Sequence, residues 1–298
     1  MDFGRVDQSK LGEINFKLSK EPYSNSKVLK GRTGNLPKFY VGLAKWGKKE
    51  WIGHLYPGGT KESAFQTQYL HHFNTIEFNA THYKLPSEQD VGRWTGRIGD
   101  GDFVFCPKVY QGISHYGNLK EKQFLTDVFF TNLRRFGKHL GPVFLQVSDK
   151  FGPKRKEELF SYLETLPKEL SIFLEVRHPD WFKEPMKDDF FDSLKKLKTG
   201  AVITDTAGRR DVAHMHITVP KTMIRFVGND KDATDYERLD DWIARIKYWI
   251  ESGLHEVYFF IHSIDEKFAP ELAQYFIKEL NEKCNAGLKE IIFLDQAQ

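Results

Sequence analysis

Residues 143–176 read VFLQVSDKFGPKRKEELFSYLETLPKELSIFLEV, and this stretch contains the repeating unit of the fold. It opens with a short apolar run at 143–147 and closes with another at 172–176. Between them, residues 154–166 carry apolar side chains at helical spacing. Because parallel strands need a long crossover, which is usually a helix, the stretch predicts one strand–helix–strand unit of a parallel sheet.

The same alternation extends in both directions through the 298-residue chain. Eight short apolar runs lie at residues 39–44, 75–78, 103–106, 143–147, 172–176, 201–204, 223–226 and 257–261. Helical patterns between them cover residues 64–73, 87–98, 119–140, 154–166, 186–197, 238–250 and 270–283, whereas 207–220 is too short and polar for a helix. We therefore predict an α/β protein built as a single (β/α)8 TIM-type barrel, a fold of typically about 250 residues. A doubly wound open sheet is the alternative, because the pattern does not show closure.

Two details support the helix boundaries. Ser87 followed by Asp90 is typical of a capped helix start, and Gly253 after an amphipathic stretch is typical of a helix stop. Residues 1–37 lack such periodicity and are polar and basic, so we expect an N-terminal extension in the form of an arm or partly disordered leader. The barrel domain is then expected at residues 38–298.

Composition excludes several classes of protein. No apolar run approaches the roughly 18 residues of a membrane span, and Cys106 and Cys284 are too few for a disulfide framework. The N-terminus lacks the pattern of a secretory signal, so we expect a cytoplasmic protein. The net charge is +3, and the basic excess lies in residues 1–37. A nearly neutral barrel disfavours a duplex nucleic acid as partner.

The active site of such a barrel lies at the carboxyl ends of its strands, where this sequence places many polar residues. Strand side chains alternate in direction, so Glu77 and Asn79 share one side of the sheet, as do Glu175 and Arg177. From these positions we predict catalytic roles for Glu77, Glu175, Asp205 and His262. The predicted substrate-binding residues are Trp46, Asn79, Tyr83, Lys108, Gln146, Arg177, His178 and Arg225.

Several strings of residues are distinctive enough to compare with known protein families. They include IEFNATHYKLP at 76–86, FLQVSDKFGP at 144–153, FLEVRHPDWF at 173–182, TDTAGRRDVAHM at 204–215 and FAPELA at 268–273. With Trp46, Trp51, Tyr56 and Pro57, they resemble the YecE-like family, domain of unknown function seventy-two, over residues 39–282. The resemblance implies a TIM-type barrel and no established reaction. Its kinship to sugar isomerases is an analogy at the level of the fold.

The chain departs from that family in two places. Many members have Arg-Leu-His-Gly after the seventh strand, where this chain has Arg225, Phe226, Val227 and Gly228. Many have Asn-Asn after the eighth strand, where this chain has His262 and Ser263. A role of the missing histidine would therefore fall to His262 or be absent.

Our first hypothesis is an enzyme of isomerase or hydrolase type acting on a small anionic or sugar-like molecule. Lys108, Arg177 and Arg225 would bind a phosphate or carboxylate, and Glu77 and Glu175 would be an acid/base pair with opposite pKa shifts. Asn79 and Gln146 would orient hydroxyls, while Trp46, Tyr83 or Trp181 would stack on a sugar face. The loop at 206–210 would either bind an anion or form a salt bridge to Asp211.

Two alternatives stay open. No nucleotide-binding motif occurs, so no cofactor is expected, but Glu77, Glu175, Asp205 and His262 would also suit a divalent metal. The second hypothesis is a non-catalytic protein whose charged barrel mouth binds a phosphate-bearing partner. In that case the basic extension would add affinity for RNA or a single strand.

Overall fold

The computed structural model describes residues 3–31, 34 and 36–296. All eight predicted strands are present: β1 (Lys38–Leu43), β2 (Thr75–Phe78), β3 (Val104–Pro107), β4 (Val143–Gln146), β5 (Ile172–Glu175), β6 (Gly200–Asp205), β7 (Lys221–Val227) and β8 (Glu256–His262). The strand–helix–strand unit at residues 143–176 is confirmed as β4, a helix and β5, with Val143 in register with Ile172.

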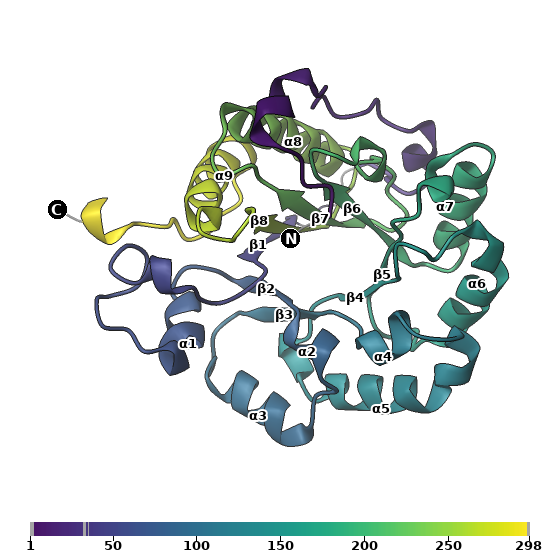
Figure 1. Ribbon diagram of the computed structural model, residues 1–298, viewed down its shortest axis with the longest axis horizontal. Coiled ribbons are helices and arrows are strands. Elements are labelled where there is room, and N and C mark those ends of the chain that lie inside the picture. The colour runs from purple at the N-terminus through teal and green to yellow at the C-terminus, as the bar shows by residue number, and fades with distance from the viewer. Residues whose placement is uncertain (1–2, 32–33, 35, 297–298) are drawn as a thin grey trace.

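The strands form one parallel sheet in the order β3-β2-β1-β8-β7-β6-β5-β4. Pairing of β1 with β8 brings the first and last strands together, and isolated bridges from Phe105 to Leu140 and from Lys108 to Phe144 join β3 to β4. Helices surround this ring of strands (Figure 1). The barrel is therefore confirmed, and the open sheet is excluded.

The seven predicted helices are present, five with shorter ends and the last two, α8 and α9, longer than predicted, and α2 and α4 are short additional helices. They are α1 (Phe65–Tyr69), α2 (Ala80–Tyr83), α3 (Glu88–Gly96), α4 (Gln111–Ser114), α5 (Gln123–Arg134), α6 (Lys156–Thr165), α7 (Met186–Lys196), α8 (Ala233–Glu251) and α9 (Ala269–Cys284). Ser87 and Asp90 form the predicted capping box of α3. Gly253 ends α8 with a φ of 114°, a conformation that side-chain-bearing residues rarely adopt. No helix in the described part of the chain is both long and apolar enough to cross a bilayer.

Alternation along the strands divides the apolar residues into two layers. One layer packs between the strands and the surrounding helices, which is the larger core. The other fills the barrel interior with Cys106, Phe144, Phe173, Val202, Met223, Tyr258 and Phe260. This interior layer fixes which strand residues point inward and therefore which residues further along each strand reach the barrel mouth.

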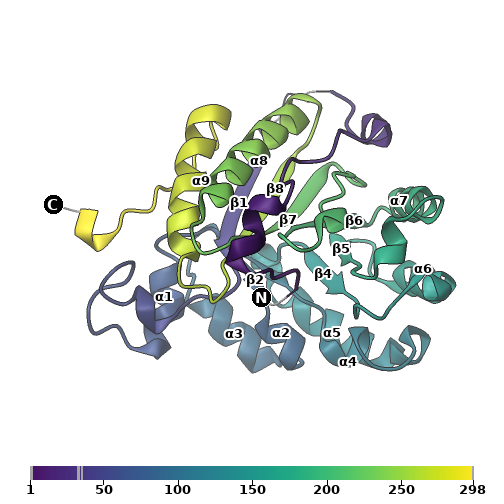
Figure 2. The same cartoon turned by 45° about the horizontal axis from the view of Figure 1, so that its top comes forward.

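The N-terminal extension is attached to the barrel through individual side chains. Leu11 and Leu29 are buried, and the Asn25 side chain donates to the Met215 carbonyl and accepts from the Ile217 amide, both at 2.8 Å. Figure 2 shows its first helical turn beside α8. These contacts occur at irregular spacing, which is why periodicity did not reveal them. Residues 1–2, 32–33 and 35 lie outside the described part, and the domain boundary at residue 38 stays a prediction.

Candidate active site

The barrel mouth collects the side chains that follow the interior layer by two residues. Glu175 follows Phe173 along β5, Arg225 follows Met223 along β7, and His262 follows Phe260 along β8. Each pair therefore shares the inward face of its strand. By the same rule the interior residues Cys106 and Phe144 place Lys108 and Gln146 at this mouth.

Arg225 lies at the centre of the resulting polar cluster. Its Nε and Nη2 donate to the two carboxylate oxygens of Glu77, both at 2.8 Å, and its Nη1 donates to Glu175 at 2.7 Å. All three side chains are at most 2% exposed. One planar guanidinium thus joins two carboxylates from opposite parts of the barrel, a contact for which arginine is better suited than lysine.

Two further groups complete the binding of these carboxylates. Arg177 Nε donates to Glu175 at 2.7 Å, and Asn79 Nδ2 donates to Glu77 at 2.9 Å. Arg177 and Arg225 line the pocket at the barrel mouth, whereas Glu175, which both contact, does not. The predicted sharing of faces by Glu77 with Asn79 and by Glu175 with Arg177 is confirmed by these contacts.

His262 is held between two carboxylates. Its Nε2 lies 2.9 Å from Glu77 and its Nδ1 lies 3.1 Å from Glu266. Because a carboxylate only accepts hydrogen bonds when ionised, both ring nitrogens must donate, which requires the imidazolium form. Burial would lower the pKa of His262, but the charges of Glu77 and Glu266 raise it above its ordinary value.

The two central carboxylates are both ionised, contrary to the opposite shifts that we expected. Burial by itself would raise the pKa of each group. The charges of Arg225 and His262 hold the pKa of Glu77 well below its usual range, and those of Arg177 and Arg225 lower the pKa of Glu175 to about 2. The reason is that Arg225 lies between the carboxylates and stabilises both. Neither group is a suitable proton donor at neutral pH.

Lys108 lies beside this cluster and is only 8% exposed. Its Nζ donates to Gln146 Oε1 at 2.8 Å and lies 5.9 Å from the centre of the Phe144 ring. Burial and the positive charge of Arg225 lower the pKa of Lys108 to about 8, although Glu175 and Glu77 oppose the shift. The cluster therefore contains an amine that is unusually easy to deprotonate.

A pocket of about 610 Å³ opens above these groups. Trp46 and the exposed Tyr83 form part of its wall, and Lys45 lies at its rim. Of the residues predicted to act at the site, it is lined by Trp46, Glu77, Asn79, Tyr83, Lys108, Gln146, Arg177, Arg225 and His262. Glu266, His82 and His115 also line the pocket and were not among the predicted site residues.

Those three residues lie on loops or short helices after the strands, where alternation gives no direction. His82 Nδ1 lies 2.8 Å from the Val109 carbonyl oxygen and must donate to it, so the neutral ring leaves Nε2 as an acceptor. Burial and the nearby Lys108 lower the pKa of His82 to about 4. The spacing of Glu266 four residues after His262 is the one signal that could have indicated their contact.

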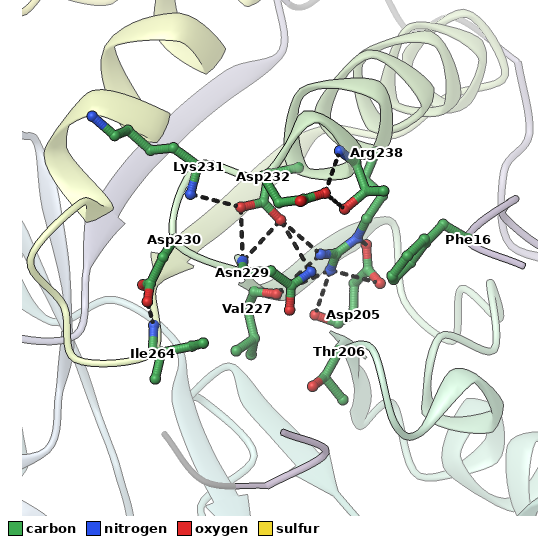
Figure 3. Close-up of polar contacts among 12 residues, drawn as sticks. Phe16, Asp205, Thr206, Val227, Asn229, Asp230, Lys231, Asp232, Arg238 and Ile264 are labelled. Atoms are coloured by element: carbon green, nitrogen blue, oxygen red, sulfur yellow. Dashed lines mark hydrogen bonds and ion pairs between the residues drawn. The ribbon is translucent and has the colours of Figure 1, made fainter. Parts of the chain in front are cut away.

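The structure does not place Asp205 in this pocket. Thr204 lies in register with Arg225, so the next residue of β6 faces the opposite side, toward α8. There the Asp205 carboxylate binds Arg238 (Figure 3). It also binds Arg210 and accepts from Trp242 Nε1 at 2.7 Å. The residue is fully buried and does not line the pocket.

His178 and the loop at 206–210 also lie outside the pocket lining. The His178 side chain caps the helical turn Pro179–Phe182 by accepting from the Asp180 amide. Arg209 forms the predicted salt bridge to Asp211 at 2.7 Å, and the Gly208 amide donates to the Gly4 carbonyl at 2.7 Å. Arg209 and the Gly208 amide are therefore engaged within the protein.

The residues considered as metal ligands are not brought together as a set. Glu77 and Glu175 are both bound by Arg225, and Asp205 faces α8. Among the residues described, no group of three or more histidine, cysteine or acidic side chains has the arrangement of a metal site. Among the described residues, the site is an ion-pair network beside the Lys108 amine.

Comparison with known proteins fits this architecture. A family model described as "Protein of unknown function DUF72" matches residues 40–291. The chain belongs to the DUF72 family. The UPF0759 protein YecE of Escherichia coli K12 is 30% identical over 260 residues, covering 81% of this chain and 92% of that protein.

Solved DUF72 structures share the fold. A member from Enterococcus faecalis V583 superimposes with a TM-score of 0.65 at 19% identity, covering 82% of this chain and 98% of that one. A member from Thermotoga maritima MSB8 gives a TM-score of 0.64 at 22% identity, covering 82% and 99%. At these identities the likeness concerns the fold alone.

The two positions at which the chain departs from the family pattern lie on neighbouring strands. Val227, where many members have histidine, lies in register with His262 on the neighbouring strand. A histidine at either position therefore enters the same part of the barrel mouth. In this chain His262 contacts Glu77 from β8.

Proposed function

We propose that the pocket is the active site of an enzyme that acts on a small anionic, sugar-like molecule, by an isomerase or hydrolase type of reaction. The observation that carries the proposal is the setting of Arg177. Its Nε is fixed by Glu175, while neither Nη group has a hydrogen-bond partner in the described part of the chain. A guanidinium with two free donors on a pocket wall is suited to a carboxylate or phosphate.

The rest of the pocket suits a molecule of sugar size. Its volume of about 610 Å³ falls within the range of small-ligand sites, which is roughly 300–1,000 Å³. Trp46 and Tyr83 offer aromatic faces, and Asn79 and Gln146 offer amides for hydroxyl groups. Lys45 at the rim adds a second positive charge for the anionic group.

Proton transfer is assigned to a neutral amine and a protonated imidazole. Lys108, with a pKa of about 8, is the candidate base, and the His262 imidazolium is the candidate acid. Glu77 and Glu175 stay ionised and fix the cations around the substrate. This division replaces the acid/base pair of glutamates suggested by the sequence.

The test is a ligand screen with a matched pair of arginine variants. Phosphorylated and carboxylated sugars are added to the wild-type protein, to Arg177→Met and to Arg209→Met, and binding is followed as a rise in melting temperature. Arg209 stacks on the same Phe3 ring as Arg177 but does not line the pocket. We expect ligands to raise the melting temperature of the wild-type and Arg209→Met proteins. The affinity of Arg177→Met for the same ligands should be at least tenfold weaker.

Proton NMR of each bound compound then separates catalysis from binding. Consumption of the compound supports an enzyme, and binding without conversion supports the non-catalytic binder instead. Equal binding by both arginine variants, or no binding by any compound, would contradict an anionic ligand at this site.

A further inference from the structure

Lys108 differs from the other cations of the cluster in its hydrogen-bond partner. Arg225, Arg177 and His262 each contact at least one carboxylate oxygen at 3.1 Å or less. No carboxylate among the described residues lies within 4.0 Å of Lys108 Nζ, whose one protein hydrogen bond there is to the neutral Gln146 amide. A buried amine without a counter-ion is stabilised in its uncharged form.

The charges within the ion-pair cluster also favour the uncharged form of Lys108. Three buried carboxylates, Glu77, Glu175 and Glu266, face three cations, Arg177, Arg225 and the doubly donating His262. These six groups balance without any contribution from Lys108. A protonated Lys108 would add an uncompensated charge beside two arginines, whereas a neutral amine leaves the cluster balanced.

The amine is also held in place. The Lys108 amide donates to the Phe78 carbonyl at 3.2 Å, and its carbonyl accepts from Thr81 Oγ1 at 2.8 Å. The side chain runs past the Phe144 ring to Gln146 and reaches the pocket surface. The nitrogen therefore has a fixed position from which its lone pair can meet a bound molecule.

From these contacts we propose that the Lys108 amine is a nucleophile that forms a Schiff base with the carbonyl carbon of a small aldehyde or ketone carrying a carboxylate or phosphate. The inference rests on the proposed function, because it specifies the substrate class of the same pocket. The Nη groups of Arg177 bind the anionic group, and Lys108 meets the carbonyl carbon. The lowered pKa of Lys108, about 8, agrees with this role.

The reaction needs no oxidant or reductant. The amine lone pair forms a C–N bond as the C=O π electrons move to oxygen, and transfer of one proton from nitrogen to that oxygen gives a carbinolamine. A second proton converts the oxygen into a leaving water, the C–O bond breaks and the C=N bond forms. The His262 imidazolium is the acid proposed for this second proton, and the free water later reverses the step by hydrolysis.

Trapping by reduction tests the proposal on the full-length protein. Glyoxylate or dihydroxyacetone phosphate is added at pH 8 with cyanoborohydride, whose hydride reduces the C=N bond to a stable secondary amine. Mass spectrometry of peptides then locates the adduct. We expect one major adduct, at Lys108, formed at least tenfold faster than on any other lysine, and formed more slowly as the pH falls below 8.

Two variants and a neutral probe sharpen the result. Lys45→Met removes the other lysine that lines the pocket. It should still be labelled at Lys108, although more slowly because a positive charge near the anionic group is lost, whereas Lys108→Arg keeps a cation and should lose the adduct. Glycolaldehyde, which lacks an anionic group, should react at least tenfold more slowly than glyoxylate. Peptide mapping of the wild-type protein gives the answer even if Lys108→Arg fails to fold.

The outcomes distinguish this inference from the proposed function. Adducts spread over surface lysines, or located at Lys45, overturn the role of Lys108. If glyoxylate or the phosphate raises the melting temperature without labelling Lys108, the Schiff base is wrong and anion binding stands. If neither probe binds nor labels the protein, and the sugar screen also fails, both proposals fail.

Discussion

Two buried arginines lie at the same end of this barrel, and each joins two carboxylates. Arg225 joins Glu77 to Glu175 inside the barrel, and Arg238 joins Asp205 to Asp235 outside it. Both arginines are at most 2% exposed. Arg225 lines the pocket at the barrel mouth, and Arg238 does not. Residue type and burial alone therefore do not separate a functional charge cluster from a structural one.

The difference arises from what covers each cluster. Phe16 of the N-terminal extension lies beside Arg238 (Figure 3), with its ring centre 5.0 Å from the guanidinium carbon. A second ring, Phe226, lies at 4.3 Å. Its donors also reach the Val227 carbonyl, so they are fully used within the protein. Arg225 is covered from below by Phe144 and is open to the pocket above. We call the Arg238 ion pairs the outer cluster and the Arg225 ion pairs the inner cluster. We infer that the outer cluster fixes α8 to the barrel and that the inner cluster takes part in binding a ligand.

The largest expected effect is on the outer cluster. Arg238→Met leaves Asp205 and Asp235 buried without their shared cation, and removing one partner of a buried pair costs about 3–5 kcal/mol. Urea unfolding measures the loss. Arg245→Met is the control, since Arg245 pairs with Glu21 at a partly exposed site and should cost about 1 kcal/mol or less. Similar losses in the two variants would show that the outer cluster is not structural.

The inner cluster should appear in the acid stability of the protein. The pKa of Glu175 is lowered from 4.5 to about 2, so its contribution is present above pH 4.5 and is lost as the pH falls toward 2. That shift corresponds to about 3 kcal/mol. The free energy of unfolding, measured from pH 6 to 2, should fall less steeply in Glu175→Gln. Glu169→Gln, in the exposed pair with Arg134, should keep the wild-type slope.

A conservative change separates the two clusters by function. Arg225→Lys keeps the charge but cannot join both carboxylates, so we expect a loss of about 2 kcal/mol in stability and at least tenfold in affinity for a ligand found by the screen. Titration calorimetry measures the affinity. Arg238→Lys should destabilise the protein while its affinity stays within twofold of wild type. Equal loss of affinity in the two variants would contradict the assignment of the pocket to the inner cluster alone.

The fold was predictable because the apolar runs are short, regular and separated by amphipathic stretches. The packing of the N-terminal extension was not, because Leu11, Asn25 and Leu29 contact the barrel at spacings that follow no helix or strand. Such contacts depend on where the rest of the chain has already folded. No local pattern in residues 1–37 contains that information.

The site was partly predictable for a physical reason. The alternation of strand side chains correctly grouped Glu77 with Asn79 and Glu175 with Arg177. The same rule places Asp205 on the opposite face of β6 from Thr204, which faces the barrel interior. The pKa shifts were not predictable, because they depend on Arg225 lying between the two glutamates. That arrangement depends on strand order and register, and neither can be obtained from the sequence pattern.

The smallest effect is expected where the extension meets the pocket. The Phe3 ring lies 4.1 Å from the Arg177 guanidinium carbon, and the Phe3 and Gly4 carbonyls accept from Thr206 Oγ1 at 3.2 and 3.1 Å. Phe3→Ala removes a cation–π contact of about 0.5–1 kcal/mol at a site that is not fully buried. Arg177 then has greater freedom, so we expect a two- to fivefold weaker affinity for an anionic ligand with a change in stability below about 1 kcal/mol.

Phe16→Ala is the matched test on the other cluster, since that ring covers Arg238 instead. It should lower the urea midpoint more than Phe3→Ala does, because Phe16 shields a fully buried ion pair, and it should leave ligand affinity unchanged. If Phe3→Ala has no effect on affinity, the extension only covers the barrel. If Phe16→Ala weakens binding as much as Phe3→Ala, the two clusters are coupled through the extension and are not independent.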